Sequence, residues 1–168
     1  KRARVGQMPK QIIVFDAVGT LLRPVQRISQ TYFSLGQQYG SRKTISEIKS
    51  EFGKLFRKYF RAGSPTSEEL EQSKWRKLIC QLFGDVTDRD ELFADLWDYY
   101  SQPQNWQLFD DVIPCWELLL RESDALLIAS NFDSRLHSIL RAMPPLDQVD
   151  AVFVSSEIGF PKPSRQFF

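Results

Sequence analysis

The sequence has few of the residues that build disulfide frameworks or zinc sites. It contains two cysteines and one histidine among 168 residues. Cys80 and Cys115 lie in stretches with helical periodicity, so we expect both to be buried free thiols, as is usual in a reducing compartment. His137 is the single histidine, so there is no histidine cluster for zinc. These scarcities argue against a disulfide-stapled scaffold and against a zinc enzyme.

Long apolar runs and an excess of one charge are also missing. The apolar run Ile12–Phe15 is far too short to span a bilayer, and the basic residues near the start (Lys1, Arg2, Arg4 and Lys10) are not followed by a signal-peptide type of run. The formal net charge of +1 gives no electrostatic basis for binding nucleic acid or an anionic membrane. We therefore expect a soluble, cytoplasmic protein with neither partner.

The segment 11–22 organises the chain. Residues 12–15 are apolar, and three of the four are β-branched, which predicts a short strand buried on both faces. Asp16 follows directly, at the place where open α/β sheets bind ligands. Gly19 allows a sharp turn, and Thr20 adds a hydroxyl within reach of an anionic group.

Amphipathic helices fill the middle of the sequence. Pro24 is expected in the first turn of one helix, and capping boxes at 44–47 and 66–69 predict the start of two more. The four predicted helices span about 24–39, 44–60, 66–83 and 88–100. They predict a small bundle whose aromatic stripes pack in its core and do not bind a cofactor.

The pattern changes after Pro103. Residues 106–109 are expected to be a short connection, followed by a helix at 112–122. The apolar runs 125–130 and 151–154 predict two more short strands like residues 12–15, with a helix from about Asp133 between them. Strands that alternate with helices predict a parallel sheet, into which the helical bundle is inserted after the first strand.

Each predicted strand ends in a different polar group. The first offers the carboxylate of Asp16, the second the side chains of Ser130 and Asn131, and the third is followed by the ammonium of Lys162. Parallel strands point their carboxyl ends the same way, so we expect these groups to converge in one crevice. A nucleophilic carboxylate beside a fixed cation and hydrogen-bond donors suits displacement at a centre that carries negative charge.

Residues 15–22, Ser130-Asn131 and Lys162-Pro163 resemble the first three motifs of the haloacid dehalogenase (HAD) superfamily. The helical insertion resembles the type 1 cap of its subfamily I, and residues 130–136 are similar to one group of HAD-like hydrolases within it. The resemblance covers about 11–168. It implies an α/β fold with a Rossmann-like core of residues 11–22 and 107–168 and a helical cap of residues 23–106.

The resemblance also implies an activity and a site. It implies hydrolysis of a small phosphorylated or otherwise anionic metabolite by a monomer or homodimer, with Asp16 forming an aspartyl-enzyme intermediate. Lys162 and Thr20 are the other implied catalytic residues. The implied substrate-binding residues are Ser130, Asn131 and Gly19. Mg²⁺ is the implied cofactor, with Asp16 and the backbone carbonyl of Val18 as its ligands.

Val18 departs from the family pattern. HAD phosphatases carry an aspartate there as the general acid for the leaving group, and its loss removes a contribution of about 10² to 10⁴ in rate. The dehalogenase and phosphonatase branches also lack this acid, and a halide leaves without a proton. However, no motif locates the cap arginine or cap lysine of those branches, and Phe167 and Phe168 stand where dehalogenases carry a tyrosine.

The fourth family motif, an acidic strand end that completes the magnesium site, would lie beyond Lys162. We therefore expect the sequence to be part of a longer chain. Asp16 and the Val18 carbonyl alone are too few ligands for Mg²⁺, and without further strands the opening strand would be a sheet edge. Two alternatives stay open: a non-catalytic HAD scaffold with a binding or regulatory role, and a metal-independent enzyme of the 2-haloacid dehalogenase type.

Other polar residues are assigned structural roles. We expect Asp133 and Arg135 to form a local helix cap and a surface pair. Asp110 and Asp111 are interpreted as a helix entrance, and His137 as a partly exposed helix residue.

Overall fold

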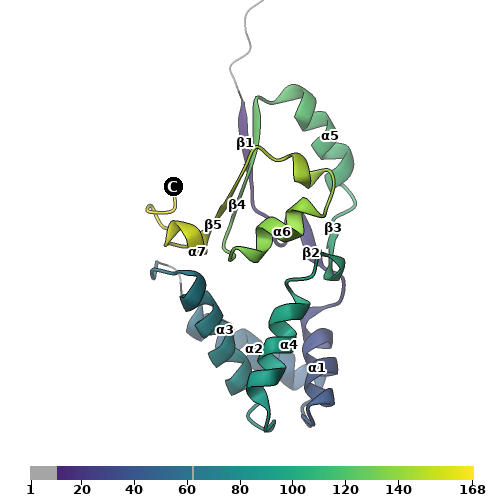
Figure 1. Ribbon diagram of the computed structural model, residues 1–168, viewed down its shortest axis with the longest axis vertical. Helices are drawn as coiled ribbons and strands as arrows, with labels where there is room; N and C mark the ends of the chain where they lie inside the picture. Colours follow the sequence, from purple (N-terminus) through teal and green to yellow (C-terminus); the bar gives the residue numbers. More distant parts are fainter. Residues whose placement is uncertain (1–10, 62) are drawn as a thin grey trace, which may run out of the picture.

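A small parallel sheet and a helical bundle occupy opposite ends of the molecule (Figure 1). The computed structural model describes residues 11–61 and 63–168. The strands are β1 (Ile12–Phe15), β2 (Leu22–Pro24), β3 (Trp106–Leu108), β4 (Ala125–Ser130) and β5 (Ala151–Val154). The helices are α1 (Ile28–Gln38), α2 (Ile45–Tyr59), α3 (Glu68–Leu82), α4 (Arg89–Tyr99), α5 (Val112–Glu122), α6 (Arg135–Arg141) and α7 (Ser155–Ile158), with short 3-10 helices at Pro103–Asn105 and Leu146–Gln148.

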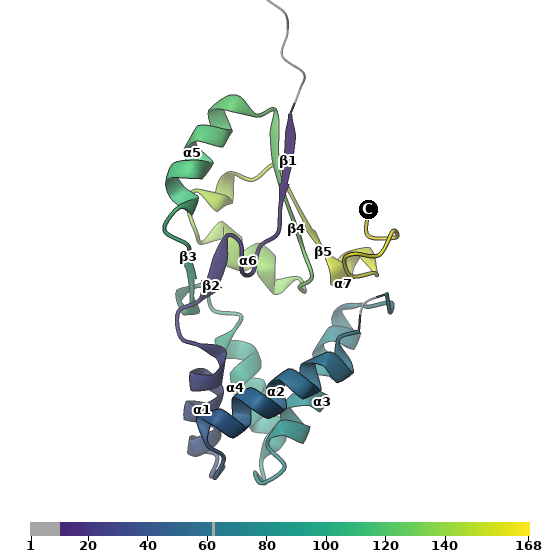
Figure 2. The same ribbon diagram turned by 180° about the vertical axis from the view of Figure 1, so that it is seen from behind.

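The main sheet has the strand order β1-β4-β5, and both of its strand pairs are parallel. This confirms the predicted parallel sheet. In the part of the chain that the structure describes, β1 is an edge strand, as expected for a sheet without further strands beside it. Helices α5 and α6 lie on the same side of the sheet in both ribbon views (Figure 2). Their buried side chains, including Trp116 and Ile139, pack against Leu126 and Ile128 of β4.

The prediction that β1 is buried on both faces is wrong. Ile12 and Val14 are 64% and 52% exposed, whereas Ile13 and Phe15 pack against the hydrophobic core. The side chains of a strand alternate between the two faces of a sheet. Within residues 11–61 and 63–168, helices cover one face only, so the other half of the apolar run stays exposed.

Helices α1 to α4 form the predicted bundle, which has a hydrophobic cluster of its own. Gly36 of α1 lies against Phe83, where an added Cβ would be 2.5 Å from the aromatic ring, so this helix crossing requires glycine. The capping box of Thr44 and Glu47 is confirmed at the start of α2. The second predicted capping box, at 66–69, is wrong: Ser67 is the N-cap of α3 and accepts a hydrogen bond from the backbone N–H of Leu70, and leucine has no carboxylate to return it.

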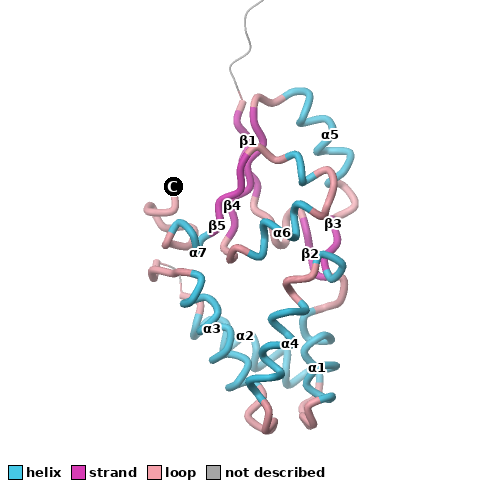
Figure 3. Tube along the Cα trace, viewed as in Figure 1, coloured by secondary structure: helices cyan, strands magenta, loops and turns pink. Residues whose placement is uncertain are grey.

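A two-stranded antiparallel ribbon, β2 paired with β3, joins the sheet to the bundle (Figure 3). Two predictions fail here, because residues 106–108 form a strand and Pro24 lies in β2, opposite Trp106. Helix α1 therefore begins only at Ile28. Proline is tolerated at the edge of such a short ribbon, and three-residue strands are too short to give a clear period.

The cysteines are free but not buried. Cys80 is partly exposed and Cys115, on α5, is exposed. Helical periodicity predicted the helices, but it did not show that these two positions lie away from the buried side. None of the helices in the described part of the chain is long and apolar enough to cross a membrane.

Candidate active site

The chain brings Asp16 and Lys162 into direct contact across 146 residues of sequence. Asp16 follows β1 and Lys162 follows α7, and the Lys162 Nζ donates to Asp16 Oδ1 at 2.9 Å. Lys162 also donates to the carbonyl of Ala129 at 2.6 Å, and the Ala17 N–H donates to Asp16 Oδ1 at 2.9 Å. Among residues 11–61 and 63–168, no hydrogen bond reaches Oδ2. One carboxylate oxygen is thus held while the other stays available.

Asn131 holds the loop that carries Lys162. Its Oδ1 accepts from the Lys162 backbone N–H at 2.6 Å, and its Nδ2 donates to the Lys162 carbonyl at 3.1 Å. Both ends of this amide are therefore engaged with the backbone. Ser130, the last residue of β4, is 2% exposed. Substrate contacts by Ser130 and Asn131 remain a prediction.

The turn after Asp16 is tight. Gly19 has φ of +91°, which favours glycine, and its N–H donates to the Leu22 carbonyl at 2.8 Å. The Thr20 N–H donates to the Ala17 carbonyl at 3.2 Å, and its side chain is exposed. The Val18 carbonyl accepts no hydrogen bond from the described residues. This oxygen is therefore free to act as a ligand.

The donor set does not complete a magnesium site. No group of three or more His, Cys, Asp or Glu side chains that could hold a metal occurs in the described part of the chain. The Asp16 carboxylate and the Val18 carbonyl are the candidate ligands. Mg²⁺ requires six oxygen ligands in octahedral geometry, so these two residues alone would leave most of its coordination to water and substrate.

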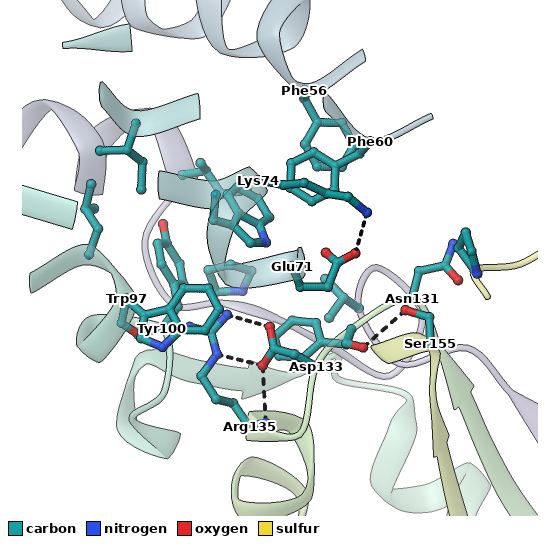
Figure 4. Close-up of a pocket in the computed structure, with 18 of the residues that line it drawn as sticks. Phe56, Phe60, Glu71, Lys74, Trp97, Tyr100, Asn131, Asp133, Arg135 and Ser155 are labelled. Carbon is teal, nitrogen blue, oxygen red and sulfur yellow. Dashed lines mark hydrogen bonds and ion pairs between the residues drawn. The ribbon is translucent and has the colours of Figure 1, made fainter. Parts of the chain in front are cut away.

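A cavity of about 460 Å³ lies between the sheet and the bundle (Figure 4). Its volume is within the range of small-molecule sites, which is roughly 300 to 1,000 Å³. Val18, Asn131 and Lys162 line it from the sheet. The helical bundle of α1 to α4, called the cap from here on, contributes aromatic side chains, among them Phe52, Phe56, Phe60 and Trp75. A part of the aromatic stripe expected in the bundle core thus faces the cavity.

Asp133 and Arg135 form a buried ion pair, not the expected surface pair. Asp133 is 2% exposed, and its two oxygens accept from Arg135 Nε at 2.7 Å and Nη2 at 2.8 Å. Arg135 Nη1 donates to the carbonyl of Trp97 on α4, and the guanidinium lies 3.4 Å from the centroid of that indole ring. The pair therefore ties the start of α6 to the cap. The spacing of Asp133 and Arg135 in the sequence gave no indication that Arg135 would contact Trp97.

A second connection joins the start of α3 to the sheet, and sequence reasoning missed it. The Glu68 carboxylate accepts from the Ser134 N–H and hydroxyl, each at 2.9 Å, and from the Ser156 hydroxyl. Beside it, the Thr66 N–H donates to the Gly159 carbonyl at 2.8 Å. Figure 1 shows α3 reaching α7 at this point. The helical bundle therefore contacts the sheet side of the molecule at two places, through Trp97 and through Thr66 and Glu68.

Fold and site together define a class of protein. It is an α/β protein in which an aspartate and a lysine pair near the carboxyl ends of the parallel strands, with a helical bundle on the other side of the cavity. No protein-family model matches the chain. Haloacid dehalogenase-like hydrolase domain-containing protein 3 of Danio rerio is 26% identical over 178 residues, covering 96% of this chain and 70% of the relative. An uncharacterised hydrolase of Schizosaccharomyces pombe is 26% identical over 162 residues, covering 94% of this chain and 71% of the relative.

The fold is that of solved HAD proteins. A HAD hydrolase of Bacillus subtilis bound to magnesium superposes with a TM-score of 0.65 at 21% identity, covering 96% of this chain and 72% of that one. Structures with the same fold include a dehalogenase and a HAD phosphatase. The chain is therefore similar in sequence to HAD-like hydrolases, and it has the fold of solved HAD-superfamily proteins.

Proposed function

We propose that the protein hydrolyses a small phosphorylated or otherwise anionic metabolite through a covalent intermediate on Asp16. The observation that supports this proposal most directly is the contact of Asp16 with Lys162, which itself lines the cavity. A carboxylate held at one oxygen and free at the other is arranged for attack. The neighbouring ammonium offsets the negative charge that approaches with the substrate.

The proposed reaction has two steps. First, Asp16 Oδ2 attacks the electrophilic centre of the substrate, and the bond from that centre to the leaving group breaks, giving an aspartyl ester or acyl phosphate. Water then cleaves this intermediate, which releases the product and restores the carboxylate. Lys162 and the Ala17 N–H hold Oδ1 throughout. The cap excludes bulk water while the intermediate exists.

Val18 restricts the leaving group. It lines the cavity but offers no proton, so departure of a poor leaving group such as an alkoxide loses general-acid assistance. This favours substrates whose leaving group needs no proton. The same observation supports a second candidate function, a 2-haloacid dehalogenase, because a halide leaves as a stable anion.

Turnover of p-nitrophenyl phosphate and of 2-chloropropionate, each with and without Mg²⁺, tests the proposal. We expect at least one compound to be hydrolysed by the wild-type protein and not by Asp16→Asn. Asp110→Asn makes the same chemical change at an exposed helix entrance and serves as the control, with activity unchanged. Activity on 2-chloropropionate without metal would favour the dehalogenase. No turnover of either compound would favour a binding or regulatory module.

A further inference from the structure

Four side chains of the cap form a continuous aromatic surface, here called the aromatic wall: Phe52, Phe56, Phe60 and Trp75. Phe52, Phe56 and Phe60 recur every fourth residue along α2 and its C-terminal cap, and neighbouring rings stack with centroids 5.9 and 4.7 Å apart and interplanar angles of 20° and 17°. Trp75 comes from α3, and its ring centroid is 4.7 Å from that of Phe60. All four side chains line the cavity.

The aromatic wall is not fully covered by the protein. Phe56 is 39% exposed, and the other three side chains are only partly buried. The neighbouring apolar residues of the same helices, such as Leu55 and Leu78, are buried in the bundle cluster. The exposed parts of the four rings therefore do not contribute to the buried core of the bundle. These rings are available to a ligand in the cavity.

The lysine beside the aromatic wall is paired with a carboxylate. Lys74 Nζ lies 5.9 Å from the centroid of the Phe60 ring, and it also contacts the Glu71 carboxylate at 3.1 Å. Glu71 and Lys74 thus offset each other, while Arg61, which also lines the cavity, adds a positive charge on the cap side. Lys162 lines the cavity from the sheet side, and its ammonium contacts the Asp16 carboxylate. The cavity is thus polar at the sheet and aromatic at the cap.

We infer that the substrate carries a flat aromatic ring that packs against the aromatic wall while its anionic group is held near Lys162. This inference rests on the proposed function of the same site, which it makes more specific. Aromatic rings stack well on one another in offset or edge-to-face arrangements. A short aliphatic acid or phosphate would leave the aromatic wall uncovered. An aryl phosphate or a nucleotide would place its ring on the wall and its anionic group near Lys162.

Binding of phosphonates tests this inference without any turnover, because their P–C bond is not hydrolysed. Phenylphosphonate and methylphosphonate carry the same anionic group and differ in the ring, and calorimetry compares their affinities. We expect phenylphosphonate to bind about tenfold more tightly, as one stacked ring contributes on this order. Phe56→Ala should remove most of this advantage and leave methylphosphonate unaffected.

Phe153→Ala is the matched control. Phe153 is 43% exposed, close to Phe56, but it lies on β5 and does not line the cavity. This variant should keep the preference for phenylphosphonate. Equal affinities for the two phosphonates, no measurable binding of either, or an equal effect of both variants would overturn the inference.

Two further experiments distinguish a nucleobase from a simple aryl ring and test the inference separately from the proposed function. Binding of uridine 5′-monophosphate and of phenyl phosphate to Asp16→Asn distinguishes a nucleobase from a simple aryl group, and tighter binding of either than of glycerol 3-phosphate supports the inference. Tighter binding of glycerol 3-phosphate would contradict it. A preserved ring preference together with no effect of Asp16→Asn on turnover would refute the proposed function alone.

Discussion

Single residues set the chemistry of this protein more than its stability. The Asp16 side chain is 47% exposed and that of Lys162 21%. Ion pairs as exposed as this one contribute roughly 0 to 1 kcal/mol to folding. The pair therefore matters chiefly for orientation: it fixes one carboxylate oxygen and places a positive charge beside the incoming anion.

Lys162→Gln should lower kcat by about 10²-fold, the effect of removing one electrostatic donor from an active site. The midpoint of thermal unfolding should change little. Lys43→Gln is a matched control, because the Lys43 side chain is also 21% exposed and pairs with Glu51 at 2.6 Å in the bundle. A Lys162→Gln enzyme as active as the wild type would show that the ammonium has no part in the reaction.

Val18→Asp should raise turnover of phosphate monoesters with poor leaving groups by about 10²-fold, since it restores a proton donor at the leaving group. Turnover of 2-chloropropionate should not rise. Steady-state kinetics on both substrates measures the change. Val25→Asp places the same acid at a position 50% exposed and outside the cavity lining, and should have no effect. No gain in Val18→Asp would mean that proton transfer does not limit the phosphate reaction.

Among the elements, α2 has the best defined local signal. The Thr44 backbone N–H and hydroxyl donate to the Glu47 carboxylate at 2.8 and 2.7 Å, and Thr44 accepts from the Glu47 N–H. These hydrogen bonds lower the pKa of Glu47 from its ordinary value of 4.5. A carboxyl with a lowered folded pKa stabilises the fold above the unfolded pKa, and this contribution is lost as the pH falls through the folded pKa.

Thr44→Ala should therefore reduce the free energy of unfolding by about 1 kcal/mol at neutral pH. The difference from the wild type should shrink as the pH falls from 4.5 through the lowered pKa of Glu47 in the folded protein, because Glu47 becomes protonated in both proteins only below that lowered pKa. Urea denaturation at several pH values measures it. Ser50→Ala, at an exposed position within α2, controls for the loss of a hydroxyl. A difference that stays constant with pH would contradict the coupling to Glu47.

At the level of the whole molecule, polar side chains connect the cap to the sheet. Arg135 connects Asp133 to the carbonyl of Trp97, and Glu68 connects α3 to Ser134 and Ser156. The ribbon of β2 and β3 is the covalent path between the two parts. A lid over a cavity has to open for substrate exchange, so contacts that are polar and peripheral suit this interface.

Glu68→Ala should favour an open cap. We expect a larger radius of gyration in small-angle X-ray scattering and a higher KM, with a small change in thermal stability, because the hydrophobic clusters of the two parts are untouched. Glu69→Ala is the neighbouring control, since the Glu69 side chain accepts a hydrogen bond from Ser67 in its own helix turn and not, among the described residues, from the sheet side. If both variants scatter like the wild type, Glu68 does not hold the cap closed.

Local signals were sufficient for much of the fold. The apolar runs of β4 and β5, the helix at 112–122 and the capping box at Thr44 were located from sequence because each depends on residues a few positions apart. The order of the polar strand ends also indicated that Asp16 and Lys162 would meet, as they do at 2.9 Å. The β2–β3 ribbon was missed because its partners are distant and its strands are only three residues long.

Periodicity identifies the apolar side of an element but not what that side will face. The stripe that contains Phe56 reads as bundle core, yet the packing of α2 and α3 turns part of it toward the cavity. Likewise, Ile12 and Val14 are apolar but exposed in the described part of the chain, and Arg135 contacts Trp97, which is 38 residues away in the sequence. Sequence alone thus established most helices, the three strands of the parallel sheet and the polar groups at their ends. The tertiary structure determined the β2–β3 ribbon and which surfaces the elements share, because contacts between distant segments depend on how whole elements pack.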